Sequence, residues 1–276
     1  MPNSVRTILI TGATDGIGRQ TALQLASQGF RLLLHGRDEK KGEKLRKEVS
    51  QAGSPEVAYY NADFASLQAV AELAEQIAFE HQQLDVLINN AGLYSTQRLL
   101  SADGFELTFA VNHLAPFLLT TELLDLLKKS APARIVNVTS IAYRNALIPY
   151  EDLTWQQNYN GWKAYKASKL ALVLATFALA RRLEGSRVTA NCLHPGAVDT
   201  KMLRSVSPDT QGISAQDGAA NSVYLATSPS LQGASGLFFE NSTSVEPTPQ
   251  ARDIGEQEKL WRLSEELVSQ LRRSIK

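Results

Sequence analysis

Seven short apolar segments alternate with helical patterns along most of this chain, and that alternation restricts the fold more than any other feature. Strands separated by helices form parallel sheets, because each crossover helix returns the chain to the same end of the sheet. Segments 84–88 and 134–138 are mostly apolar, as expected where helices cover both faces. The sequence predicts an α/β fold with a doubly wound parallel sheet. Its expected strands lie near residues 5–11, 30–35, 56–61, 84–89, 133–139, 187–193 and 236–240.

The 276 residues are expected to form a single domain over residues 1–276, since α/β folds of this size are often one domain. No internal repeat or low-complexity stretch divides the chain. Segments 141–160, 203–215 and 241–254 are rich in Pro, Ser, Asn and Asp. We interpret them as loops within the domain.

Charge and cysteine content exclude several classes of protein. The 28 basic and 28 acidic residues balance, which argues against a nucleic-acid footprint or a polybasic membrane patch. Cys192 is the only cysteine, so disulfide frameworks and cysteine metal clusters are excluded. The first residues contain no apolar run, and the apolar segment 170–180 is too short to cross a bilayer. We expect a soluble, cytoplasmic protein without an integral membrane segment.

The apolar segment 170–180 also predicts a buried helix, because its apolar residues occur nearly all round the helix. A partner subunit is one way to cover such a helix. A homo-oligomer is therefore a hypothesis from this segment.

A glycine-rich turn follows the first strand. Residues 7–11 run straight into Gly12-Ala-Thr-Asp-Gly16-Ile-Gly18, and a helical pattern covers residues 19–29. Glycines let the backbone approach a pyrophosphate closely, and the start of a helix offers unpaired N–H groups. This context favours a dinucleotide site, and the alternative is a plain tight turn between strand and helix.

Tyr165 and Lys169 are four positions apart in a helix-forming run, residues 164–182, so they share one helix face. A fixed positive charge can lower the pKa of a phenol from about 10 towards neutrality. Such a phenol can act as a general acid or base. The alternative is a surface pair without function.

Further polar clusters fall at predicted strand ends, where ligands bind in doubly wound sheets. The clusters are Asn89-Asn90-Ala91-Gly92, Thr139-Ser140, Pro195-Gly196 and His35-Gly36-Arg37. Each alone is also compatible with turn formation. Asn112 lies in a helical run, and Asp63 follows the third strand, where it competes with Ser66 to cap the next helix.

Together these motifs resemble the short-chain dehydrogenase/reductase family from Thr11 to about Glu240. The match comprises T-G-x-x-x-G-x-G at Thr11, N-N-A-G at Asn89, a serine at the fifth strand end, Y-x-x-x-K at Tyr165 and P-G at Pro195. The resemblance implies a single Rossmann-type domain and an enzyme that transfers hydride between a nicotinamide dinucleotide and a carbonyl or alcohol substrate.

The resemblance also implies roles for the catalytic candidates. Tyr165 would be the general acid in reduction and the base in oxidation, and Lys169 would lower its pKa and hold the nicotinamide ribose. Ser140, rather than Thr139, would donate a hydrogen bond to the substrate carbonyl. Asn112 would hold a water that links Lys169 to solvent.

Contacts with the dinucleotide are implied at the strand ends as well. Asp63 would bind the adenine amine, Asn89 and Gly92 would shape the adenosine side, and the Pro195 segment would contact the nicotinamide. The complete set is Gly12, Thr14, Asp15, Gly16, Ile17, Gly18, Arg37, Asp63, Phe64, Asn89, Ala91, Gly92, Tyr165, Lys169, Pro195, Gly196, Val198 and Thr200.

Ser140 and Tyr165 are 25 positions apart, more than in many family members, so an insertion near 141–160 lies beside the site. This spacing, the segment 111–120, Gly36-Arg37-Asp38 and a late helix near 255–273 with Leu260-Trp261-x-x-Ser264-Glu265 resemble the retinol dehydrogenase branch. A substrate loop is expected near 198–215. Many members of that branch carry an N-terminal membrane anchor, which we do not expect here because the first residues contain no apolar run. Lipophilic aldehydes or ketones are the expected substrates. The insertion either contacts substrate or packs at a core edge through Trp155 and Trp162.

The end of the second strand favours NADP over NAD. An acidic residue there would bind the ribose hydroxyls of NAD, but Gly36 occupies that position and Arg37 follows it. A guanidinium can bind a 2′-phosphate through two hydrogen bonds. Asp15 would oppose a phosphate, and Arg37 can instead pair with Asp15 or Asp38 at the surface.

Two other classes of protein remain as alternatives. A non-catalytic dinucleotide-sensing interaction protein is disfavoured, because all four catalytic candidates are present. A sugar-nucleotide epimerase also uses Y-x-x-x-K but is longer and has another glycine spacing. His113 and His194 are expected to be packing or hydrogen-bonded residues, and no metal site is predicted.

Overall fold

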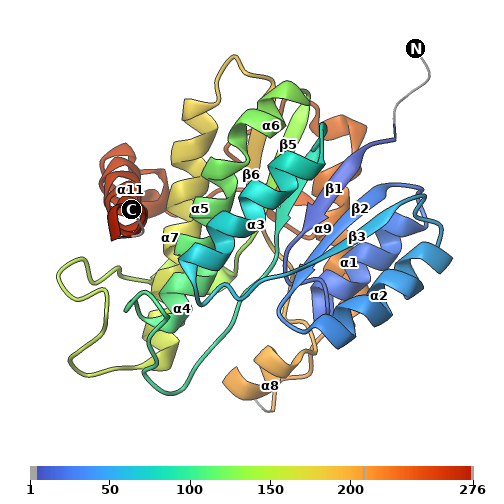
Figure 1. Ribbon diagram of the computed structural model, residues 1–276. Coiled ribbons are helices and arrows are strands. Elements are labelled where there is room, and N and C mark those ends of the chain that lie inside the picture. Colours follow the sequence, from blue (N-terminus) through green and yellow to red (C-terminus); the bar gives the residue numbers. More distant parts are fainter. Residues whose placement is uncertain (1–4, 208, 275–276) are drawn as a thin grey trace.

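The computed structural model describes residues 5–207 and 209–274 and contains an eight-stranded sheet (Figure 1). The predicted domain limits at residues 1 and 276, and position 208 of the predicted substrate loop, lie outside the described residues. All seven expected strands are present. The strands are β1 (Thr7–Ile10), β2 (Arg31–Gly36), β3 (Val57–Asn61), β4 (Val86–Asn89), β5 (Ala133–Val138), β6 (Val188–His194), β7 (Phe238–Glu240) and β8 (Thr243–Val245).

The strand order is β3-β2-β1-β4-β5-β6-β7-β8, and all pairs except β7–β8 are parallel. The chain builds outward from β1 to β3 and then returns to place β4 on the other side of β1. This reversal opens a crevice at the carboxyl ends of β1 and β4. The fold therefore places a ligand site at the point where both strands end.

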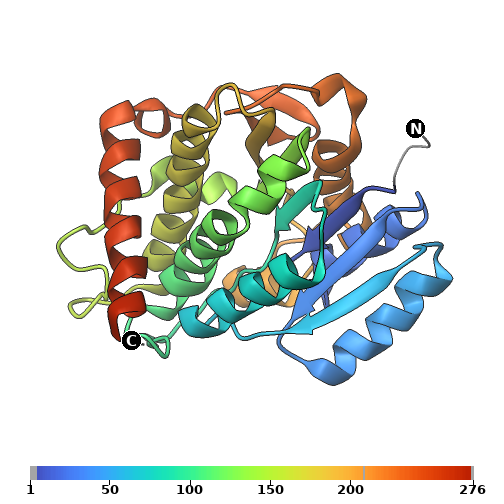
Figure 2. The same ribbon diagram turned by 45° about the horizontal axis from the view of Figure 1, so that its top comes forward.

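Helices cover both faces of the sheet, and the prediction of a doubly wound α/β fold is confirmed (Figures 1 and 2). One apolar core joins the sheet to α1 (Gly16–Ala26), α2 (Glu39–Gln51) and α9 (Ala215–Thr227). The other joins it to α3 (Leu67–Glu80), α5 (Ala115–Glu122), α7 (Gly161–Arg182) and α11 (Ile254–Ser274). The shorter elements are α4 (Leu107–Phe109), a π-helical turn (Ala110–Leu114), α6 (Leu124–Lys129), α8 (Lys201–Val206), α10 (Pro249–Arg252) and three-residue-per-turn helices at Ile141–Asn145 and Pro229–Leu231.

The eighth strand corrects the prediction of a loop over residues 241–254. Asn241 and Ser242 both have positive φ, 49° and 59°, a conformation typical of a tight two-residue hairpin turn. β8 pairs antiparallel with β7 through this turn. β8 has three residues, and they are largely exposed, so the sequence shows no apolar pattern that would predict a strand there.

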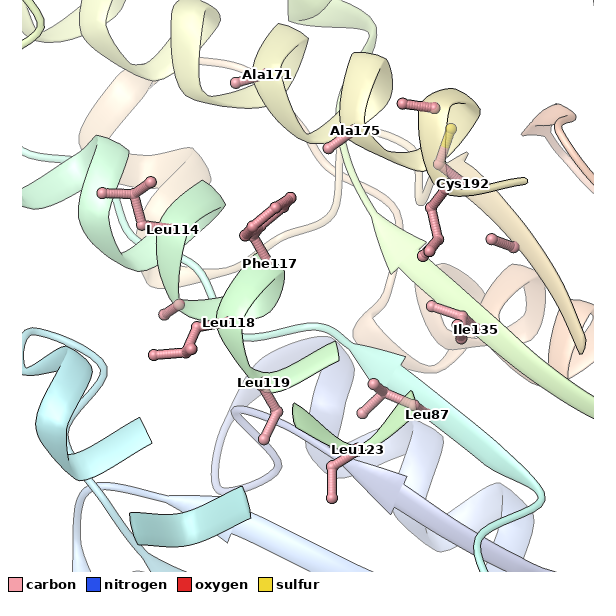
Figure 3. Packing of buried hydrophobic residues seen from close by; sticks show 14 of the residues in the cluster. Leu87, Leu114, Phe117, Leu118, Leu119, Leu123, Ile135, Ala171, Ala175 and Cys192 are labelled. Atoms are coloured by element: carbon pink, nitrogen blue, oxygen red, sulfur yellow. The ribbon is translucent and has the colours of Figure 1, made fainter. Parts of the chain in front are cut away.

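The core beneath α5 and α7 is filled by side chains from the helices and from the sheet below them (Figure 3). Leu119 and Leu123 lie near Leu87 of β4, and Cys192 of β6 lies beside α7. Burial raises the pKa of the Cys192 thiol, so it remains protonated and serves as a small apolar residue.

Helix α7 is covered by its own chain. Trp261 of α11 lies edge-on to Phe117 of α5, with ring centroids 4.8 Å apart, and Arg182 at the end of α7 lies 4.3 Å above the Trp261 ring. Figure 2 shows α11 lying alongside α7. The apolar pattern of α7 is thus explained within one chain, and the predicted homo-oligomer no longer follows from it. Among residues 5–207 and 209–274, none of the helices has both the length and the apolar character needed to cross a bilayer.

Candidate active site

The ends of β1 and β4 meet at the reversal point, and their contact sets the position of the site. Gly12 has a φ of 63°, and a Cβ added to it would lie 2.7 Å from the Cα of Ala91. The Thr11 hydroxyl accepts hydrogen bonds from the N–H groups of Asn90 and Ala91, each at 3.0 Å. The Asn90 amide donates to the carbonyl oxygens of Thr11 and Gly12. Thr11 and Asn90 were not among the predicted site residues, although their places at strand ends were a signal for them.

The glycine-rich turn forms the amino terminus of α1. The sequence predicted a helical pattern from residue 19, but α1 begins at Gly16, so Ile17 and Gly18 belong to its first turn. Asp15 caps the helix and accepts a hydrogen bond from the Gly16 N–H at 2.9 Å. The first N–H groups of a helix lack intrahelical acceptors and carry partial positive charge. The turn, with the partly exposed Gly12 and Thr14 beside it, therefore fits a dinucleotide pyrophosphate.

The start of α8 lies against this turn. Lys201 forms an ion pair with Asp15, with 2.6 Å between Nζ and Oδ2. The hydrogen bond from Lys201 holds the pKa of Asp15 below its ordinary value. A Cβ added to Gly16 would lie 3.3 Å from Cγ2 of Thr200, which caps α8. The negative charge beside the glycine turn is therefore countered by the predicted substrate loop.

Arg37 follows β2 and is exposed to solvent. Neither of its expected surface partners pairs with it, because Asp38 lies 3.7 Å from Lys41 and Asp15 binds Lys201. A Cβ added to Gly36 would lie 2.6 Å from Cγ2 of Thr14. An acidic side chain at position 36 would have to displace Thr14.

Asp63 lies at the end of β3 with an exposed side chain. It accepts a hydrogen bond from the Ala65 N–H at 3.0 Å, whereas Ser66 caps α3. The capping role is thus taken by Ser66, and the Asp63 carboxylate faces solvent beside the glycine-rich end of the sheet.

Two predicted dinucleotide contacts have side chains buried within the fold. Asn89 is 3% exposed, and its amide donates to Thr120 at 3.0 Å and Asn137 at 2.8 Å. Phe64 is 4% exposed and stacks on His35, with ring centroids 4.1 Å apart. Contacts of these two residues with a dinucleotide would have to come from their backbone atoms.

A cavity of about 130 Å³ joins the glycine turn to the predicted catalytic residues. Its lining combines polar side chains, among them Ser140 and Tyr165, with apolar ones. The cavity is lined by Ile17, Thr139, Ser140, Trp162, Tyr165, His194, Pro195, Gly196, Val198, Thr200, Met202, Leu203 and Val206. The structure therefore brings Ile17 of the glycine-rich motif and Pro195 and Gly196 of the P-G motif into one cavity.

Ser140 and Thr139 differ in their surroundings. The Thr139 hydroxyl donates to the carbonyl oxygen of Leu193 at 3.0 Å and so joins β5 to β6. The Ser140 hydroxyl accepts from the Ala142 N–H and interacts with the Tyr165 hydroxyl. Ser140 is the member of the pair that lies beside the phenol.

Tyr165 is buried among aromatic side chains. Its ring stacks on Trp162, with centroids 5.6 Å apart and planes at 14°, and Tyr94 meets it edge-on at 6.0 Å. Burial raises the pKa of Tyr165 to about 12, although the hydrogen bond with Ser140 acts in the opposite direction. The phenol is therefore protonated at neutral pH.

Lys169 shares the helix face with Tyr165, as the spacing predicted. Its Nζ lies 5.7 Å from the centroid of the Tyr165 ring and donates to the carbonyl oxygen of Val138 at 3.1 Å. Burial lowers the pKa of Lys169 to about 8. The expected lowering of the Tyr165 pKa is not found in this structure: desolvation of the phenol raises the pKa, and the opposing influence comes from Ser140.

Asn112 lies in the π-helical turn between α4 and α5. Its Oδ1 accepts from the Leu93 N–H at 2.8 Å, and its Nδ2 donates to the Leu93 carbonyl and to Ser168, one residue before Lys169. A Cβ on Gly92 would lie 3.2 Å from Asn112 Oδ1 and 3.5 Å from Lys169 Nζ. Asn112 thus ties the end of β4 to α7 beside the lysine.

The two tryptophans near the insertion have different roles. Trp155 packs against the core and meets Tyr159 edge-on at 6.4 Å. Trp162 lines the cavity and remains 42% exposed. Trp155 therefore fits the packing alternative, whereas contact between Trp162 and a substrate stays a prediction.

Two histidines near the motifs are neutral side chains of the fold. His113 is fully buried, its Nε2 lies 2.8 Å from the Ser264 hydroxyl of α11, and burial lowers its pKa to about 3. Burial, aided by the charge of Arg144, lowers the pKa of His194 to about 4. His194 also lines the cavity, a position that sequence reasoning did not predict.

Comparison with known proteins agrees with this geometry. Residues 6–211 match the family model described as short chain dehydrogenase. The chain is 42% identical over 293 residues to human retinol dehydrogenase 14, covering 97% of this chain and 87% of that protein. A solved structure of an uncharacterized protein from Mycobacterium paratuberculosis has a TM-score of 0.80 and 33% identity, covering 96% of this chain and 93% of that one. The complex of Pseudomonas aeruginosa RhlG with NADP has a TM-score of 0.70 and 25% identity, covering 85% and 93%.

The chain therefore belongs to the short-chain dehydrogenase family. It is an NAD(P)-dependent oxidoreductase similar to the retinol dehydrogenases.

Replacement of Lys169 by Met should stabilise the protein. The native pKa of about 8 lies below the ordinary 10.5, so the buried ammonium destabilises the fold below pH 8, and this cost disappears as pH rises towards 10.5. We expect Lys169→Met to raise the free energy of unfolding by about 1–3 kcal/mol at pH 7 and by little at pH 10.5. Urea unfolding at both pH values measures this, with the exposed Lys163→Met as control. A Lys169→Met protein less stable than the parent at pH 7 would contradict the prediction.

Proposed function

We propose that this oxidoreductase uses NADP to interconvert lipophilic aldehydes or ketones and their alcohols, with Tyr165 as the general acid and base. The observation that carries the proposal is a cavity lined by Tyr165 and Ser140 together with several apolar side chains. A carbonyl oxygen placed between the two hydroxyls would leave its carbon substituents among apolar side chains.

The walls of the cavity support a lipophilic substrate. Met202, Leu203 and Val206 of α8 line it together with Ser140 and Tyr165, and Trp162 adds a partly exposed ring. Burying apolar surface contributes about 25 cal/mol per Å², so substrates with larger apolar groups should bind more tightly. The name of the relative retinol dehydrogenase 14 refers to a lipophilic alcohol and agrees with this class.

The protonation state of Tyr165 supports its role in reduction. A phenol with a pKa of about 12 holds its proton at neutral pH and can give it to an oxygen on which negative charge develops. Ser140 would donate a second hydrogen bond to the same oxygen, which stabilises that charge. The bound dinucleotide supplies or accepts the hydride. In the oxidative direction Tyr165 would take the proton back from the alcohol.

The amino-terminal half of the sheet supports NADP as the cofactor. Arg37 is exposed at the end of β2, and Lys201 counters the carboxylate of Asp15 that would oppose a phosphate. Position 36 has no space for the acidic side chain that would favour NAD, because Thr14 lies against it. RhlG, a structural relative, was solved with NADP.

Replacement of Tyr165 by Phe tests the proton donor. The variant keeps the ring and its aromatic contacts but loses the hydroxyl, so kcat for carbonyl reduction should fall by roughly 10²–10⁴-fold. The affinity for NADPH, measured by fluorescence titration, should change less than about twofold. Tyr224→Phe, on α9 and remote from the cavity, is the control. Near-full turnover by Tyr165→Phe would defeat the assignment.

A series of straight-chain aldehydes tests the substrate class. Each added methylene group contributes about 0.8 kcal/mol on burial, so kcat/KM should rise by up to about fourfold per methylene until the cavity is filled. Leu203→Asp should flatten this dependence, whereas Ser205→Asp, at an exposed position of the same helix, should preserve it. A kcat/KM independent of chain length in the parent enzyme would exclude a lipophilic binding wall.

Replacement of Arg37 by Ala tests the cofactor preference. Hydrogen bonds to a charged group contribute about 1.5–3 kcal/mol, so the KM for NADPH should rise by roughly 10–150-fold while the KM for NADH changes little. Arg46→Ala removes a partly exposed arginine that pairs with Glu43 on α2 and serves as control. Equal losses for both cofactors would show that Arg37 does not bind the 2′-phosphate.

A further inference from the structure

His35 lies at the end of β2, between β1 and β3 in the sheet, and is only 3% exposed. Both nitrogens of its imidazole have partners on neighbouring strand ends. Nδ1 accepts a hydrogen bond from the Gly12 N–H at 3.4 Å, and Nε2 lies 3.0 Å from the carbonyl oxygen of Ala62. The ring also stacks on Phe64 at a centroid distance of 4.1 Å and an angle of 16°.

The two partners determine the tautomer of the ring. A backbone N–H can only donate and a carbonyl oxygen can only accept. The imidazole therefore carries its proton on Nε2, and the lone pair of Nδ1 accepts from the Gly12 N–H. Burial lowers the pKa of His35 to about 4, although the charge of Asp63 acts in the opposite direction. The neutral ring required by this geometry is therefore the form present at neutral pH.

The ring connects the segments that carry the predicted adenosine and phosphate contacts. Gly12 opens the glycine turn after β1, Arg37 follows His35 on β2, and Asp63 follows Ala62 at the end of β3. Backbone hydrogen bonds run alongside, from the Ala13 N–H to His35 at 2.8 Å and from the Ala62 N–H to Gly36 at 3.2 Å. The side chain of His35 adds a link from the glycine turn across β2 to β3.

We propose that His35 is a positioning residue for the dinucleotide, whose imidazole holds the Gly12 turn at a fixed place relative to the ends of β2 and β3. Displacement of the turn would misplace the N–H groups of α1 for a pyrophosphate while leaving Tyr165 and Ser140 in place. Loss of the imidazole should therefore weaken cofactor binding and spare the chemical step. The inference rests on dinucleotide binding at this end of the sheet, as in the proposed function.

Variants of His35 separate hydrogen bonding from packing. His35→Phe keeps a flat ring against Phe64 but removes both hydrogen bonds. His35→Asn places an amide oxygen close to the position of Nδ1, so it can still accept from the Gly12 N–H. Val49→Ala, a truncation of a fully buried side chain of α2 in the same core, controls for loss of stability alone.

We expect His35→Phe to raise the dissociation constant and the KM for NADPH about tenfold or more, with kcat at saturating NADPH within about twofold of the parent. In His35→Asn at least a third of the NADPH affinity lost in His35→Phe should be recovered. Val49→Ala should leave the affinity for NADPH unchanged. Without cofactor, hydrogen–deuterium exchange of peptides that cover residues 11–18 should be faster in His35→Phe than in Val49→Ala. Fluorescence titration with NADPH measures binding independently of turnover.

Unchanged NADPH affinity in folded His35→Phe would overturn the inference, as would equal losses of affinity in His35→Phe and Val49→Ala. If His35→Phe does not fold, His35→Asn decides: affinity within tenfold of the parent supports the inference, and a larger loss overturns it. Failure of the parent protein to bind NADPH would instead refute the proposed cofactor.

Discussion

The close contact between the ends of β1 and β4 is the constraint on which the rest of the site depends. Gly12 lies so near Ala91 that a Cβ would overlap the neighbouring backbone, and Thr11 and Asn90 bind the two ends through side-chain hydrogen bonds. This contact anchors the start of the glycine turn to the end of β4. The cavity, α8 and the Ser140–Tyr165 pair are arranged around that fixed turn.

Burial controls the chemistry of the site more than the pairing of charges does. The Tyr165 phenol and the Lys169 ammonium both lie inside the protein, and in each case desolvation favours the uncharged form. A protonated phenol suits proton donation to a carbonyl. A buried ammonium with a carbonyl oxygen as its acceptor destabilises the fold, which is typical of residues kept for function at the expense of stability.

Periodic apolar patterns allowed the seven parallel strands, the helical layers and the positions of the motifs at strand ends to be predicted from the sequence. β8 escaped prediction because its three residues carry no apolar signal. The spacing of Tyr165 and Lys169 predicted their shared helix face. Spacing says nothing about desolvation, so the predicted direction of the Tyr165 pKa shift was wrong.

Side-chain direction was a second limit of the sequence. Asn89 lies in a motif at a strand end, yet its amide binds Thr120 and Asn137 inside the fold. Trp155 and Trp162 are close in sequence, yet one packs against the core and the other lines the cavity. The sequence placed His35 in a turn cluster. Its hydrogen bonds with the Gly12 N–H and the Ala62 carbonyl oxygen, which link three strand ends, required the structure.

The covering of α7 by α11 has a consequence for synthesis of the protein. During translation α7 leaves the ribosome before β6, β7 and α11, so its outer apolar side stays uncovered while those elements are made. Exposed apolar surface on a nascent chain promotes aggregation. Arrival of Trp261 closes that side and joins it to Phe117 and Arg182. Helix α11 thus completes a core whose other elements are synthesised earlier.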